Sequence, residues 1–266
     1  CVPHLADAAQ RLYVFQRTAN FSVPAVNRPL TPEVSQKHKS RYSEWRQDAR
    51  RTPFGIAGHP PPEKFAHEDS RDERTKVYER KWGTGGNISF LYAYKNLLVD
   101  KEANETACQF VRDKIASIVR DPKLAKLLMP NDHYIGTKRL CLDTGYYETF
   151  NRDNVTLVDV KTSPIQKLYA HGLRTQDADY ELDDIVFATG FDAMTGALLD
   201  IDIRGKNGLA LATKWVDGPK TYLGLMTTGF PNMFIITGPG SPSVKTNMVS
   251  AIEQHIDWVV DRLIAM

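Results

Sequence analysis

The stretch from Asp184 to Asp192, of sequence DIVFATGFD, constrains the fold of this chain more than any other. Its four apolar residues 185–188 do not alternate with polar ones, which is typical of a short strand buried on both faces. Thr189 and Gly190 follow, and a glycine there permits positive φ or a close approach of the backbone. Open α/β sheets hold ligands at the carboxyl ends of such strands. An ordinary core strand with an ordinary turn fits equally well, so the pattern predicts an α/β fold and leaves the ligand open.

Further strands are predicted on both sides of a polar, helical region. Runs rich in β-forming residues occur at 12–15, 155–160, 165–169, 180–182 and 233–237. The last run is continuously apolar and ends in the turn 238–242, of sequence GPGSP. A turn of this kind, followed by a helix start, can offer main-chain donors to an anion or an electron-rich ring.

Helix signals dominate between the first two strands. Thr31 is suited to the N-cap of a helix and Pro32 to its first turn. Helices are predicted over 33–51, 68–82, 101–120 and 122–129, with a proline- and glycine-rich loop over 52–62. Asn247 is expected to cap a final amphipathic helix that runs to the end of the chain.

Composition excludes several classes of protein. The net charge of +2 over 266 residues gives no reason to expect binding to nucleic acid or to a membrane surface. No run approaches the ~18 uninterrupted apolar residues of a membrane span. Cys1, Cys108 and Cys141 are odd in number and far apart, which indicates free thiols in a cytoplasmic protein. The histidines form no HxxxH or HExxH pattern, so no metal site is predicted.

Both ends of the sequence predict an internal piece of a longer protein. The chain has no initiator methionine, and it stops while the final helix is still in progress.

Arg17 and Thr18 directly follow the first strand. In a dinucleotide-binding βαβ unit, the end of the second strand faces the adenosine ribose, where an arginine accommodates the 2′-phosphate of NADP. A guanidinium beside a hydroxyl suits a phosphate. A solvated surface arginine fits the same residues, and the glycine-rich turn that would decide the matter is not in the sequence.

Residues 136–140, of sequence GTKRL, form a short basic loop before the later strands. Lys138 and Arg139 are adjacent cations that could hold a phosphate and a developing anion. An ordinary solvated turn is the alternative.

With these residues in view, the chain resembles the flavin-dependent Baeyer–Villiger monooxygenases. The similarity keeps its order along the chain and covers residues 12–24, 136–140, 146–155, 187–197, 221–224 and 229–248. It implies two cofactors, FAD and NADPH, and two small-molecule substrates, O₂ and a ketone. In this family a C4a-peroxyflavin attacks the ketone, and one oxygen atom is inserted to give an ester or a lactone.

The resemblance also implies the domain organisation and the site residues. The fold class is α/β, with parts of two Rossmann-like dinucleotide-binding domains and a helical insertion. Residues 1–24 and 137–187 would belong to the NADP domain, 25–136 to the insertion and 188–266 to the FAD domain. Arg139 would be the catalytic arginine. The cofactors would be held by Arg17, Thr18, Lys138, Thr189, Gly190, Phe191, Asp192 and Met248, and the substrate pocket would include Val244, Lys245 and Thr246.

Two departures from the family pattern matter. Both GxGxxG fingerprints and the FxGxxxHxxxW signature are missing, so the isolated chain is not expected to hold FAD or turn over. Lys245 is more polar than expected for its place in the pocket, which leaves the ketone open.

Three alternatives stay open at this point. The parent protein could be an N-hydroxylating flavin monooxygenase or a sulfide-oxidising one, and the chain itself could be a catalytically inactive truncated product. A monomer without metal, membrane or nucleic-acid partners is predicted in each case.

Overall fold

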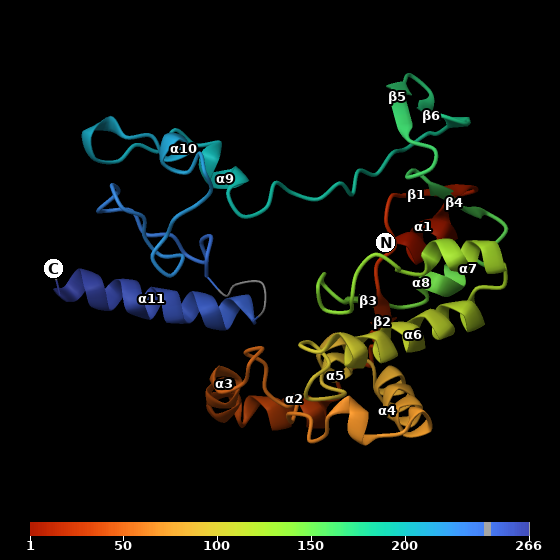
Figure 1. Cartoon of the computed structure of the whole chain (residues 1–266), viewed down its shortest axis with the longest axis horizontal. Coiled ribbons are helices and arrows are strands. Elements are labelled where there is room, and N and C mark those ends of the chain that lie inside the picture. Colours follow the sequence, from red (N-terminus) through yellow and green to blue (C-terminus); the bar gives the residue numbers. More distant parts are fainter. Residues whose placement is uncertain (242–245, 266) are drawn as a thin grey trace. The chain divides into compact units, whose positions relative to one another are not determined.

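The computed structural model describes residues 1–241 and 246–265 (Figure 1). These residues form two compact units. Unit 1 comprises Cys1–Pro29 and His59–Val186, and unit 2 comprises Leu30–Gly58 and Phe187–Met266. Each unit therefore combines an early segment of the chain with a later one.

Unit 1 contains two pairs of parallel strands. β1 (Leu12–Gln16) pairs with β4 (Val155–Asp159), and β2 (Ser22–Pro24) pairs with β3 (Cys141–Asp143). Two short helices, α1 (Val2–Ala8) and α8 (Tyr146–Thr149), precede β1 and β4 respectively. This pairing places the segment after β1 beside the segment that leads into β3.

An antiparallel sheet follows β4 in the same unit. It consists of β5 (Ile165–Tyr169), β6 (Gly172–Thr175) and β7 (Asp179–Glu181) in the order β5-β6-β7. The predicted strands 12–15, 155–160, 165–169 and 180–182 are therefore confirmed within one or two residues. β2, β3 and β6 were not predicted, because runs of three or four residues show no clear period.

The other helices of unit 1 lie between β2 and β3 in the sequence. They are η1 (Ala66–Glu68), α4 (Arg71–Thr84), α5 (Asn87–Leu91), α6 (Lys101–Ile118) and α7 (Pro122–Leu128). Ser70 and Glu73 form a capping box at the start of α4, and Asp121 caps α7 with Pro122 in its first turn. The predicted helices are confirmed, with boundaries set by these local caps.

The core of unit 1 is built on the apolar face of α6. Ala107, Val111 and Ile115 are fully buried along this face, and they belong to one cluster with Tyr78 of α4 and Phe90 of α5. The same cluster includes Phe21, just before β2, and Val23 within it. It also includes Ile135 and Leu140, at the two ends of the basic loop. Burial of this surface is the main contribution to the stability of the unit.

Unit 2 has a smaller core and less regular structure. Its helices are α2 (Pro32–Lys39), α3 (Tyr42–Arg50), α9 (Gly196–Leu199), η2 (Lys206–Gly208), α10 (Leu211–Lys214) and α11 (Met248–Ala265). In the described part of the unit, the main buried apolar cluster is formed by Leu211, Trp215, Phe230 and Ile235. The N-caps predicted at Thr31 and Asn247 are confirmed, because their side chains accept from the amides of Val34 (3.3 Å) and Val249 (3.1 Å).

The segment 30–58 packs on α11. Arg46 and Arg50 form ion pairs of 2.5 and 3.2 Å with Glu253, and the amide of Asn247 donates to the carbonyl of Phe54 (2.8 Å). The single helix predicted over 33–51 is wrong in one respect: it is divided into α2 and α3 by a turn at Ser40 and Arg41.

Two predicted strands are wrong. Residues 185–188 are extended but belong to no strand, and Val186 and Phe187 are 71% and 66% exposed. Residues 233–237 also form no strand, although the amide of Ile235 donates to the carbonyl of Leu225 (2.8 Å). The physical reason is that a strand is stabilised by its ladder partners, and no strand among the described residues pairs with either run.

Candidate cofactor and active site

Arg17 and Thr18 lie where β1 ends, and both are exposed. The chain turns back into the core directly afterwards, because Ala19 and Phe21 are buried. Within the described residues, neither side chain takes part in a hydrogen bond or an ion pair. A guanidinium and a hydroxyl are thus available to a ligand at the carboxyl end of a parallel strand.

The basic loop lies between two buried anchors. Ile135 and Leu140 are 1% and 4% exposed, whereas residues 136–139 between them are all exposed. Gly136 has a φ of +88°, and a Cβ atom there would lie 2.5 Å from a methyl carbon of Leu98. The loop therefore needs a glycine at its start, and its fixed ends present Lys138 and Arg139 to solvent.

The loop and the end of β1 are joined by Asn20. Its Nδ2 atom donates to the carbonyl oxygen of Arg139 (3.0 Å), and Ser22 pairs with Cys141 in the β2–β3 ladder. Unit 1 thus contains four of the predicted site residues, Arg17, Thr18, Lys138 and Arg139, on segments in direct contact. Three of them are cations, which suits an anionic ligand such as a phosphate.

The other predicted cofactor residues lie in unit 2. Thr189, Gly190, Phe191 and Asp192 are exposed, and the ring of Phe191 is fully so. Gly190 has a φ of +86°, and a Cβ atom at this position would meet nothing within 4 Å. Met248 begins α11 and is 41% exposed. Within the described residues, no hydrogen bond joins 189–192 to 246–248.

Of the predicted pocket residues, only Thr246 is described. It lies close to the loop 52–58, since a Cβ atom on Gly55 would be 2.8 Å from its Oγ1 atom. Val244 and Lys245 lie outside the described residues.

Two turns of unit 2 are tied together by hydrogen bonds. Thr221 Oγ1 donates to the carbonyl of Pro239 (2.6 Å) and accepts from the amide of Gly224 (3.2 Å), and the amide of Gly238 donates to the carbonyl of Gly224 (3.1 Å). A Cβ atom on Gly238 would lie 2.4 Å from that carbonyl oxygen. Neither Thr221 nor Gly224 was singled out from the sequence, although Gly224 ends one of the matching segments.

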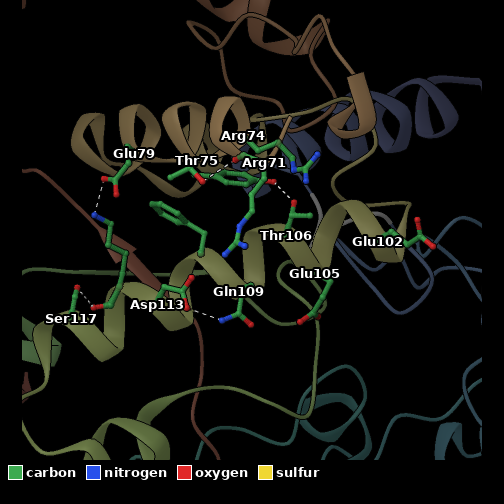
Figure 2. Close-up of a pocket in the computed structure, with 13 residues that line it drawn as sticks. Arg71, Arg74, Thr75, Glu79, Glu102, Glu105, Thr106, Gln109, Asp113 and Ser117 are labelled. Atoms are coloured by element: carbon green, nitrogen blue, oxygen red, sulfur yellow. Dashed lines mark hydrogen bonds and ion pairs between the residues drawn. The ribbon is translucent and has the colours of Figure 1, made fainter. Parts of the chain in front are cut away.

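Two clefts in the described residues contain none of the predicted site residues. A cleft of about 700 Å³ lies between α4 and α6 (Figure 2). Most of its polar side chains pair with one another: Lys114 contacts Glu79 (2.7 Å), Gln109 contacts Asp113 (2.7 Å), and Tyr78 shares a hydrogen bond with Thr106 (2.8 Å). A second cleft of about 520 Å³ in unit 2 is lined by Lys206, Lys220 and neighbouring threonines.

Two structural searches were negative for the described residues. None of the helices in residues 1–241 and 246–265 is long and apolar enough to cross a membrane. The same residues contain no group of three or more His, Cys, Asp or Glu side chains placed to hold a metal ion.

Comparison with known proteins identifies relatives over almost the whole chain. No protein-family model matches it. The chain is 41% identical over 259 residues to 2-oxo-Δ³-4,5,5-trimethylcyclopentenylacetyl-CoA monooxygenase of Pseudomonas putida, which covers 97% of the chain and 47% of the relative. It is 38% identical over 265 residues to a Baeyer–Villiger monooxygenase of Pseudooceanicola batsensis, with 98% and 47% covered. The chain is a relative of the Baeyer–Villiger monooxygenases.

A solved structure of a Baeyer–Villiger relative has the same fold. The chain matches the crystal structure of OTEMO in complex with FAD and NADP with a TM-score of 0.95 and 41% identity, over 100% of this chain and 49% of that one. This match confirms the predicted fold class, α/β with parts of two Rossmann-like dinucleotide-binding domains. The chain spans about half the length of the curated relatives it matches.

Proposed function

We propose that this chain is part of a Baeyer–Villiger monooxygenase that uses FAD, NADPH and O₂ to convert a ketone into an ester or a lactone. The observation that carries the proposal is the relationship to such enzymes over almost the whole chain. The anchored, exposed loop that presents Lys138 and Arg139 supports it further. The proposal concerns the whole protein, because the relatives are about twice as long as this chain.

NADPH would be recognised by Arg17, Thr18 and Lys138. The 2′-phosphate is the only group that distinguishes NADPH from NADH, and it carries up to two negative charges. Two exposed cations and a hydroxyl on adjoining segments of unit 1 match that chemistry. Lys138 has one competing contact, an Asp132 carboxylate oxygen at 3.9 Å, which is too long for a strong ion pair in solvent.

FAD would lie against residues of unit 2. Residues 189–192 offer exposed backbone around a glycine with open space beside it, which is what a planar ring needs for a close approach. Met248 would lie along the same cofactor. When bound and reduced by NADPH, FAD would activate O₂, which supplies the oxygen atom that is inserted.

Arg139 would stabilise negative charge during oxygen insertion. A guanidinium is a planar cation with several donors, so it can hold an anion next to the cofactor and then the oxyanion formed from the ketone carbonyl. Its backbone is fixed through Asn20 and the buried Leu140, while the side chain is exposed. A lysine would serve less well, since its ammonium is compact and strongly hydrated.

The substrate pocket would include Val244, Lys245 and Thr246. Thr246 is the described member, and it lies against Gly55, so the loop 52–58 would border the pocket. We also propose that the protein acts as a monomer in the cytoplasm; its unpaired cysteines support the compartment.

Arg139→Ala in the full-length protein tests this function. We expect ester formation to fall by on the order of 10²–10³, as on the loss of an oxyanion-stabilising donor, while NADPH still reduces the flavin. Arg120→Ala is the control, because Arg120 is an exposed arginine of the same unit, at the end of α6, whose side chain has no described partner. An unchanged ester yield in Arg139→Ala would remove this residue from the mechanism.

A further inference from the structure

A chain of hydrogen bonds runs beneath the basic loop and ends on the backbone of Arg139. Asp132 Oδ1 lies 2.6 Å from His133 Nδ1, and His133 Nε2 lies 3.0 Å from Asn20 Oδ1. Asn20 Nδ2 then donates to the carbonyl oxygen of Arg139 (3.0 Å). The side chain of His133 is only 8% exposed. The chain of contacts thus joins a buried imidazole to the residue proposed to be catalytic.

The orientation of the Asn20 amide is fixed by its neighbours. The carbonyl oxygen of Arg139 can only accept a hydrogen bond, so the atom that faces it must be the NH₂ group of Asn20. The amide of Phe21 can only donate, and it lies 3.0 Å from the other side-chain atom, which must be the oxygen. Both neighbours therefore require the same orientation.

That orientation determines the protonation of one nitrogen of His133. The ring nitrogen Nε2 faces an amide oxygen, which has no proton to give, so Nε2 must carry the proton. On the other side of the ring, Nδ1 faces the carboxylate of Asp132. This contact fixes the ring on its second side.

Asp132 is ionised at neutral pH. Its hydrogen bond to His133 is the main cause that lowers the pKa of the carboxyl, and the positive charge of Lys138 adds to the effect. The charged groups around the ring are therefore Asp132 on one side and Lys138 beyond it, 3.9 Å from the same carboxylate. From β2 the ring is contacted by the edge of Phe21 (5.3 Å between centroids) and by Asn20, whose Nδ2 also lies 3.3 Å from Cys141 Sγ.

We propose that His133 is a positioning residue for Arg139, with Nε2 donating to the side-chain oxygen of Asn20. Asp132 fixes one side of the ring, and the other side holds the Asn20 amide in the orientation that binds the Arg139 carbonyl. Asn20 thereby joins the basic loop to the end of β1, where Arg17 and Thr18 lie. The proposal rests on the role of Arg139 in the proposed function.

A purely structural role for His133 predicts a different order of activity among its variants. If the ring only fills space against Phe21, then His133→Phe should be tolerated, and His133→Gln, which loses the ring, should be worse. If the ring positions Asn20, the order reverses. Glutamine can still donate one N–H to the Asn20 oxygen, whereas phenylalanine can donate nothing.

The protonation of Nε2 can be measured in the full-length protein without any turnover. With ¹⁵N-labelled histidine, the nuclear magnetic resonance signals of His133 should show hydrogen bonded to Nε2. The exposed His171 serves as the internal reference. A His133 ring with hydrogen on Nδ1 alone would overturn the proposal, and this measurement needs no substitution that could disturb folding.

The positioning role is tested in the full-length protein. We expect His133→Phe to lower ester formation about 100-fold, the loss that a small misplacement of a catalytic group produces, with His133→Gln in between and flavin reduction unchanged. If Arg139→Ala abolishes ester formation and His133→Phe does not lower it, this inference fails and the proposed function stands. If Arg139→Ala has no effect, the proposed function fails first.

Discussion

At the scale of single residues, the predicted nucleotide contacts are side chains that no other group among the described residues binds. Arg17 and Thr18 have no hydrogen-bond or ion-pair partner within the described residues, and they follow a parallel strand. Their residue types could be read directly from the sequence. The contact that joins them to the basic loop could not, because Asn20 and Arg139 are 119 positions apart.

Arg17→Ala tests the phosphate contact in the full-length protein. Loss of one charge-assisted hydrogen bond should cost about 1.5–3 kcal/mol, so the KM for NADPH should rise strongly while that for NADH changes little. Arg11→Ala, an exposed arginine at the opposite end of β1, is the matched control. Equal effects on the two cofactors would show that Arg17 does not contact the 2′-phosphate.

Asn104 is a buried polar residue whose loss should lower the stability of unit 1. It is buried in α6, its Nδ2 donates to the carbonyls of Leu97 and Ile135 (both 2.8 Å), and its Oδ1 accepts from the amide of Ile135 (3.0 Å). The side chain therefore holds the residue that anchors the start of the basic loop.

Asn104→Ala should lower the free energy of unfolding by about 3 kcal/mol, because buried backbone groups of Ile135 lose their partners. Urea unfolding followed by circular dichroism measures this difference. Asn131→Ala, which removes an exposed local hydrogen bond to Met129, should cost far less. Similar losses in the two variants would contradict the anchoring role.

At the scale of elements, the sequence predicts helices better than strands, and the reason is physical. The caps at Thr31, Asp121 and Asn247 accept hydrogen bonds from amides within three residues. The start of a helix is therefore determined by residues close to it in the sequence. A strand depends on partners far away in the sequence. The apolar runs 185–188 and 233–237 have the composition of buried strands, yet neither has a ladder partner among the described residues.

The contact between α4 and α6 should make unit 1 sensitive to alkaline pH. Burial raises the pKa of Tyr78 to about 12, and burial together with the hydrogen bond to Asp69 raises the pKa of Tyr94. Burial also raises the pKa of Tyr147 in α8. These phenols keep their protons to a higher pH in the folded state than in the unfolded one, so the folded state is favoured below the unfolded pKa of about 10 and loses this advantage above it.

We therefore expect the free energy of unfolding to fall as pH rises above about 10. The contribution of Tyr78 alone would reach about 3 kcal/mol when the unfolded phenol is ionised and the folded one is not. The free energy of unfolding, measured with urea at several alkaline pH values, should fall less steeply with pH in Tyr78→Phe. In Tyr134→Phe it should fall as steeply as in the unchanged protein, because Tyr134 is 36% exposed. If Tyr78→Phe left the pH dependence of the free energy of unfolding unchanged, the ionisation of Tyr78 would not be coupled to folding.

At the scale of the whole molecule, the sharing of the helical region between the two units is the feature that the sequence did not reveal. The helical region 30–58 belongs with α11 through Glu253 and Asn247, whereas helices α4 to α7 belong with the parallel strands. Because these polar helices have similar compositions, their sequences do not indicate which later segment each will contact. The predicted domain limits at 24, 136 and 187 remain predictions.

The unequal cores of the units give the last prediction. Unit 1 buries a cluster of more than twenty apolar residues, whereas the main cluster of unit 2 has four buried members in its described part. Since apolar burial dominates stability, unit 2 should unfold first on heating, and calorimetry should resolve two transitions. Trp215→Ala should cost about 3–5 kcal/mol and shift only the lower transition, while Ile115→Ala should cost about 2–5 kcal/mol and shift only the upper one. If either substitution moved both transitions together, the two units would be one cooperative folding unit, and the argument from separate cores would not hold.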